Sequence, residues 1–203
     1  MTGSVPMPDV MVDLETLGQR PGCVILSIGA VAFDPVAGRF GQQFHTIINR
    51  DDCIAHGLVE DLETLAWWKR QSPEARAVLR RALESPVGLI PALEAFAAFV
   101  KAQAGKVCMW GNGADFDNAI LAHTYNLVGI KQPWMFWNSR CFRTLKNLRP
   151  EITVPRTGLH HDALADAQHQ AEHAVALFAG MRTGAQAANG RAVSDSAPEG
   201  EAA

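Results

Sequence analysis

Short apolar runs broken by turn residues occupy the first quarter of the chain. Segments 9–15, 23–34 and 39–49 are rich in Val, Ile and Phe, and the turn sequences GQRPG and DPVAG separate them. Runs of β-branched and aromatic residues bounded by Gly and Pro are typical of strands. The pattern therefore predicts three successive strands, which we expect to form an antiparallel meander.

Helical periodicity replaces this pattern in the middle of the chain. We predict a helix over 62–70, and a second that begins at Ser72-Pro73, a typical N-cap and first-turn proline, and ends near Ser85. Segment 89–103 repeats apolar residues every three or four positions, which indicates a third helix.

Predicted strands and helices then alternate as far as residue 181. We predict strands over 106–110 and 134–137, and helices over 116–127, 140–148 and 162–181. Three strands followed by this alternation predict an α/β sandwich with a mixed sheet. We see no internal repeat and no linker, so residues 9–181 are expected to form one domain between a flexible N-terminus, 1–8, and a disordered tail, 182–203, which has no periodicity.

Composition narrows the class of protein without selecting a function. The 203 residues are 48% hydrophobic and 19% charged, and the net charge of −3 argues against a protein that coats nucleic acid non-specifically. No signal peptide and no apolar run of roughly 20 residues is visible, so we expect no membrane association. The four cysteines are scattered, which favours reduced thiols in a cytoplasmic protein.

Two acids stand one residue apart in the first predicted strand. Side chains two positions apart share a face of a strand, so Asp13 and Glu15 point the same way. Paired carboxylates repel each other unless positive charge lies between them, commonly a divalent metal. The alternative is a strand end at which both acids are solvated.

A second acidic segment, WGNGADFDNAIL, lies where a predicted strand gives way to a helix. Open α/β sheets usually bind ligands at this position, so Asp115 and Asp117 are candidates, and Asn112 could hydrogen-bond nearby backbone. The alternative is that these acids only cap the helix that follows.

The third acidic segment, LHHDALADAQHQAEHA, opens the last predicted helix. His161 ahead of this helix and Asp166 in its early turns can face the same cleft. Alternatively, residues 162, 166, 169 and 173 form one helical stripe that could bind zinc, or His169 and His173 are surface residues.

Taken together and in order, these segments resemble the motifs of the DEDDh 3′–5′ exonuclease superfamily. DxE matches Asp13 and Glu15, Asn followed by Phe-Asp matches Asn112 to Asp117, and His with Asp five positions later matches His161 and Asp166. The stretches DLETLG, VILSIGAVAFD, TLAWWKRQSPEAR and PWMFWNSRCFRTL are similar to a small bacterial and phage exoribonuclease branch, and the resemblance covers about residues 9–180.

This resemblance implies a ribonuclease H-like three-layer fold with a mixed five-stranded sheet flanked by helices. It implies that Asp13, Glu15, Asp117 and Asp166 hold two divalent ions, Mg²⁺ or Mn²⁺, and that His161 is the general base. Thr16 and Leu17 are the expected contacts to the terminal nucleotide. The implied reaction releases nucleoside 5′-monophosphates from the 3′ end of single-stranded RNA or DNA, with RNA favoured, and a homodimer is expected.

Other residues and other functions stay open at this point. Arg140, Arg143, Lys146 and Arg149 recur every three residues and either bind phosphates or form a solvated helix face. Of Trp67 and Trp68, at least one is expected in the core or a subunit interface. The rival functions are an exodeoxyribonuclease of the same superfamily, a phosphatase with Asp13 as nucleophile, and a zinc-containing nucleic-acid-binding module without enzymatic activity.

Overall fold

A five-stranded mixed sheet forms the centre of the protein, in a computed structural model that describes residues 5–156 and 161–194. The strand order is β3-β2-β1-β4-β5, with β1 antiparallel to β2, β2 antiparallel to β3, and β4 parallel to both β1 and β5. The strands are β1 (Asp9–Thr16), β2 (Ile25–Asp34), β3 (Arg39–Ile47), β4 (Cys108–Gly111) and β5 (Ser139–Cys141). The predicted meander is confirmed.

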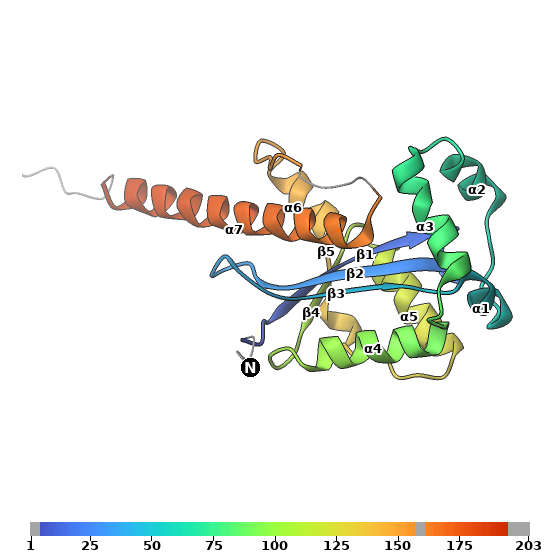
Figure 1. The fold of residues 1–203 in the computed structure, drawn as a ribbon. Coiled ribbons are helices and arrows are strands. Elements are labelled where there is room, and N and C mark those ends of the chain that lie inside the picture. The colour runs from blue at the N-terminus through green and yellow to red at the C-terminus, as the bar shows by residue number, and fades with distance from the viewer. Residues whose placement is uncertain (1–4, 157–160, 195–203) are drawn as a thin grey trace, which may run out of the picture.

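Helices cover both faces of this sheet. Figure 1 shows α7 and α6 above it, α4 and α5 below it, and α1 to α3 grouped at one end. The helices are α1 (Arg50–Ala55), α2 (Leu62–Trp68), α3 (Pro73–Glu84), α4 (Leu89–Lys101), α5 (Asp117–Leu127), α6 (Phe142–Leu148) and α7 (Ala163–Ser194). The result is the expected three-layer α/β arrangement.

The alternation of side chains along β1 divides the core between the two faces. Val10, Val12 and Leu14 join the larger cluster, which includes the buried residues of α4 and α5, whereas Met11 packs with α6 and with the alanines of α7. Successive strand residues point to opposite faces, so Asp13 and Glu15 share the α7 face with Met11.

Local sequence signals explain where several helices begin. Ser72 accepts a hydrogen bond from the Ala75 N–H and Pro73 fills the first turn of α3, as predicted. Asp61 caps α2 in the same way by accepting from the Thr64 N–H. Helix α1 was not predicted, because six residues are too few to show a period.

The predicted strand over 134–137 is wrong. Met135, Phe136 and Trp137 are exposed, and the latter two begin a short 3₁₀ helix, Phe136–Asn138. The fifth strand is instead Ser139–Cys141, three residues that carry no recognisable alternation, so α6 begins two residues later than expected. The run is apolar, but three of its four side chains face solvent and only Trp134 is buried.

Both ends of the predicted domain also differ from expectation. Met7, assigned to the flexible N-terminus, is buried, and its N–H donates to the Gln103 side chain. Helix α7 continues to Ser194, past the expected end at Met181, because Ala-rich sequence favours helix without any apolar period. Residues 1–4 and 195–203 lie outside the described residues.

Within the described residues, no single helix is long and apolar enough to cross a membrane. Helices α3 and α4 taken together meet that requirement by length and composition only, with a bend of 112° between them. All four cysteines are free thiols.

Candidate active site

A cavity of about 510 Å³ opens at the ends of β1 and β4, between α2, α6 and α7. Its wall contains three of the predicted acids, three histidines and three cationic side chains. These residues are Asp13, Glu15, Asp166, His161, His169, His173, Arg143, Lys146 and Arg156. Acids from two distant parts of the chain therefore meet in one concave site.

The closest cluster joins β1 to the start of α7. One ligand atom from each of Glu15, His161 and Asp166 lies within 4.8 Å of the other two. Asp13 lies beside them on the same face of β1 and lines the same cavity. This set, with carboxylate oxygens in the majority, suits a hard divalent cation such as Mg²⁺ or Mn²⁺.

Asp117 takes a different position, behind the cavity wall. Its side chain is 1% exposed, and it accepts hydrogen bonds from the N–H groups of Leu14 at 3.1 Å and of Asn112 at 2.7 Å. A Cβ at residue 111 would lie 2.9 Å from the Asp117 Cβ, so Gly111 permits this close approach. Asp117 thus ties β1 to the β4–α5 junction as well as adding charge to the site.

Burial and mutual repulsion raise the pKa values of these acids. Burial, followed by the charges of Asp117 and Glu15, raises the pKa of Asp13 well above its usual value. Burial and the charge of Asp162 raise the pKa of Glu15 to about 8, and burial raises the pKa of Asp117 to about 6. The positive side chains of the protein therefore do not balance the negative charge of these carboxylates, as expected of a site that binds cations.

Two residues missed by the sequence analysis contact the acids directly. Gln170 of α7 donates from Nε2 to Asp13 Oδ1 at 2.7 Å, and Arg156 forms an ion pair with Asp166. Gln170 could have been found, because it lies four positions after Asp166 and so shares its helical face. Arg156 lies in an irregular segment where no periodicity points to it.

His161 occupies a constrained position just before α7. Its φ of 61° is the only positive value among non-glycine residues of the described chain. Its ring packs edge-on against Trp67, with the centroids 4.9 Å apart, and against Trp68 at 6.0 Å. Two tryptophans of α2 therefore hold the imidazole beside Glu15.

The tryptophan expectation is confirmed for Trp68. Its side chain is buried in the core, and Nε1 donates to the Thr16 carbonyl at 2.9 Å. Trp67 is partly exposed, and both rings line the cavity. The pair joins the hydrophobic core to the wall of the site.

The two predicted nucleotide contacts, Thr16 and Leu17, differ in position. Thr16 lines the cavity, and its hydroxyl donates to the Gly18 carbonyl at 2.6 Å. Leu17 is fully buried in the larger core cluster, and Gly18 and Gln19 take the next positions in the cavity wall. The strand ends at Thr16, so the alternation that would have turned Leu17 toward the site does not continue.

The zinc stripe along α7 does not form as a unit. Asp162 caps the helix by accepting from the Ala165 N–H, Asp166 pairs with Arg156, and His173 hydrogen-bonds the Ile152 carbonyl at 2.7 Å. The alternative that His173 is a surface residue is wrong, because this side chain is buried and packs against Phe142. His169 lines the cavity, and its Nδ1 atom has no partner among the described residues.

A close backbone approach fixes the start of α7 over the sheet. A Cβ at Gly29, which pairs with Asp13 across β1 and β2, would lie 2.1 Å from the Ala163 carbonyl carbon. Only glycine leaves room for this contact. It places the first turn of α7, with Asp166, directly over the acids of β1.

Known nucleases resemble this chain in sequence and in fold. An exodeoxyribonuclease of Enterobacteria phage T4 is 28% identical over an alignment of 161 positions, and the match covers 68% of this chain and 70% of the phage protein. In the solved structures, the chain superposes on the nuclease domain of 3'hExo, a DEDDh family member bound to rAMP, with a TM-score of 0.59, 12% identity, and 85% and 92% of the two chains covered.

A second solved structure, exonuclease I, gives a TM-score of 0.54 at 20% identity over 88% of this chain and 45% of the other. At these identities the structural likenesses show the fold alone. The family model described as 3'-5' exoribonuclease Rv2179c-like domain matches residues 8–178. The chain belongs to this family of 3′–5′ exonucleases, which are hydrolases.

Proposed function

We propose that the protein is a two-metal 3′–5′ exoribonuclease that removes nucleoside 5′-monophosphates from the 3′ end of single-stranded RNA. The observation that carries the proposal is the meeting of Glu15, His161 and Asp166, from β1 and from the start of α7, with ligand atoms mutually within 4.8 Å. Asp13 and Asp117 complete the set from β1 and α5.

The acids provide the binding charge in this reaction. Asp13, Glu15 and Asp166 face the cavity and would hold the divalent ions, and Asp117 supports the same negative field from behind the wall. Two bound ions would supply positive charge to the scissile phosphate and lower the pKa of an attacking water. Carboxylates with raised pKa values bind such ions in exchange for protons.

His161 is positioned to accept a proton at the same point. An imidazole has an ordinary pKa near neutrality, so it can take the proton of a water molecule and release it within one turnover. Its contacts with Trp67 and Trp68 limit the orientations of the ring. Thr16, in the adjacent wall, is the proposed contact to the terminal nucleotide.

RNA is favoured over DNA as the substrate on the basis of the family description, which names an exoribonuclease. The phage T4 relative is described as an exodeoxyribonuclease, so DNA is the second candidate. The two differ in the 2′-hydroxyl, which must be recognised by few contacts in the terminal-nucleotide pocket.

The test uses 5′-labelled single-stranded RNA and DNA of one sequence, each with Mg²⁺, Mn²⁺ or EDTA. We expect a ladder that shortens from the 3′ end, faster on RNA, and no cleavage in EDTA. Glu15→Gln should abolish release, whereas Asp115→Asn is the matched control, because Asp115 is exposed and outside the cavity wall. Cleavage that persists in EDTA, or full activity of Glu15→Gln, would contradict the proposed site, and faster cleavage of DNA would favour the second candidate.

A further inference from the structure

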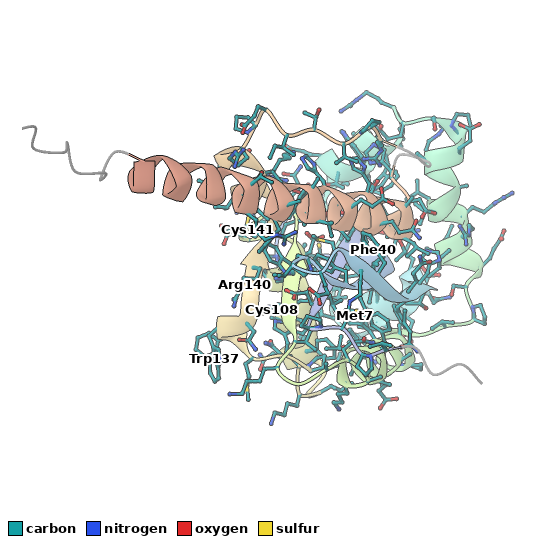
Figure 2. The ribbon with its side chains drawn as sticks, turned by 90° about the vertical axis from the view of Figure 1, so that its left-hand side faces the viewer. Met7, Phe40, Cys108, Trp137, Arg140 and Cys141 are labelled. Carbon is teal, nitrogen blue, oxygen red and sulfur yellow. The ribbon has the colours of Figure 1, made fainter. Side chains whose placement is uncertain are left out.

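Four cationic side chains recur every three residues from β5 to the residue that follows α6, and the structure separates them into two pairs. Arg140 and Arg149 are engaged by the protein itself. Arg140 donates from Nη1 to the carbonyls of Trp137 and Ser139 at 2.9 and 3.0 Å, and Arg149 forms an ion pair with Glu151. Figure 2 shows Arg140 beside Cys141 and near Cys108, below α7. This pair does not line the cavity.

Arg143 and Lys146 make the second pair. They lie three residues apart on α6, so they share a helical face, and both line the cavity that contains the acids. Within the described part of the chain, neither side chain forms a hydrogen bond or an ion pair. Arg156, the third cation of the wall, differs because it is paired with Asp166.

Arg143 lies beside the β4–α5 junction, and Lys146 lies beside an aromatic ring of its own helix. A Cβ at Gly113, in the β4–α5 junction, would lie 3.9 Å from the Arg143 guanidinium carbon. The Lys146 ammonium lies over the Phe142 ring, 5.9 Å from its centroid. The two cations thus line the cavity without an ion pair among the described residues, although the charge of Arg143 acts on the buried Asp117 and partly offsets the rise in its pKa that burial causes.

We propose that Arg143 and Lys146 form a phosphate subsite that binds the RNA backbone upstream of the scissile bond. The inference rests on the proposed function. The scissile phosphate belongs at the acids, where metal ions would hold it, so an anion at α6 must be a different group of the same substrate. The repeating phosphates of a strand provide such anions, and Arg and Lys are the side chains that bind them. The subsite aligns the strand without touching the reacting atoms.

The first test separates a substrate that has upstream phosphates from one that lacks them. The p-nitrophenyl ester of a nucleoside 5′-monophosphate contains one phosphodiester and no upstream linkage. We expect Arg143→Gln and Lys146→Gln each to raise the KM for an oligonucleotide by about tenfold or more, with kcat little changed and no effect on the ester. Arg140→Gln and Arg149→Gln are the matched controls, since they remove the same charge from the engaged pair, and they should leave both substrates unaffected.

The second test locates the phosphate. A single neutral methylphosphonate is placed at successive linkages upstream of the 3′-terminal one. In the wild-type protein, one or two of these positions should raise the KM, and the same positions should have no further effect in the Arg143→Gln and Lys146→Gln variants. The salt dependence of oligonucleotide binding should also weaken by about one phosphate contact per variant.

Two outcomes would overturn the inference: equal losses on the ester and the oligonucleotide, or equal effects of the variants and their controls. Failure of the proposed function has a different signature, because the wild-type protein would then cleave neither substrate. If the wild type cleaves both and the variants match it, only the phosphate subsite is refuted.

Discussion

At the scale of single residues, Asp117 has both an electrostatic role in the site and a structural role in the fold. It adds charge to an acidic site, and it accepts hydrogen bonds from the buried N–H of Leu14 and the partly buried N–H of Asn112. A buried N–H that loses its acceptor costs about 1–3 kcal/mol. A substitution at Asp117 should therefore affect the folded state as well as the reaction.

We predict that Asp117→Ala lowers the melting temperature more than Asp166→Ala does. Both variants remove one carboxylate of the site, but only the first leaves the N–H groups of Leu14 and Asn112 without their acceptor. At about 2–4 °C per kcal/mol for a chain of this size, the difference should be several degrees by calorimetry in EDTA. Equal melting temperatures would show that Asp117 has no structural role beyond its charge.

The sequence specifies the residues of the site unevenly. The DxE pair, the Asn-to-Asp117 spacing and the His161–Asp166 spacing are local patterns, so they can be recognised without a structure. Leu17 could not be placed, because its orientation depends on where β1 ends. Arg156 and the division of the four cations depend on contacts between elements that no local pattern encodes.

At the scale of elements, the site depends on how α7 lies across β1 and β2. Gly29 allows the Ala163 backbone to approach β2, and the buried alanines 167, 171 and 174 let the helix pack closely on Met11 and Phe33. Figure 1 shows α7 running along this face and beyond the sheet. Small residues on both elements therefore set the distance between the acids of β1 and those of α7.

We predict that Gly29→Ala lowers both stability and activity by displacing the first turn of α7. The new Cβ would meet backbone atoms, which cannot rotate away, and overpacking of this kind costs about 1–3 kcal/mol or more. Gly41→Ala is the comparison on β3, where the nearest atom, at 2.8 Å, belongs to the Met7 side chain. Urea denaturation should show a larger loss of unfolding free energy for Gly29→Ala than for Gly41→Ala. Equal losses would mean that the α7 backbone moves away from the new Cβ at little cost.

Long helices and long strands rich in Val, Ile and Phe were predictable from the sequence, and short elements were not. The meander and helices α3 to α5 follow from apolar spacing and capping residues. Strand β5 has three residues and is defined by pairing with β4, so tertiary contacts, not its own sequence, create it. The predicted strand over 134–137 is wrong because the sequence of an apolar run does not show whether other elements pack over its side chains.

At the scale of the whole molecule, the buried acids couple the stability of the fold to pH and to metal ions. The pKa of Glu15 rises from 4.5 to about 8 on folding, and that of Asp13 rises as well. Between pH 4.5 and about pH 8, the folded protein therefore binds more protons than the unfolded chain. Stability is therefore greatest at low pH in this window and falls as pH rises, by up to about 1.4 kcal/mol per pH unit for each proton.

We predict that, in EDTA, these acids make the melting temperature of the protein fall as the pH rises from 5.5 to 8. Adding Mg²⁺ or Mn²⁺ should raise the melting temperature, and the rise should be largest at pH 8. A divalent ion binds the charged carboxylates, so it has to displace fewer protons at higher pH. Glu15→Gln removes the residue with the raised pKa, and it should flatten the pH profile and reduce the metal-dependent rise at pH 8. A metal effect of equal size at both pH values, or an unchanged profile in Glu15→Gln, would mean that Glu15 is not the group through which the fold exchanges protons for metal.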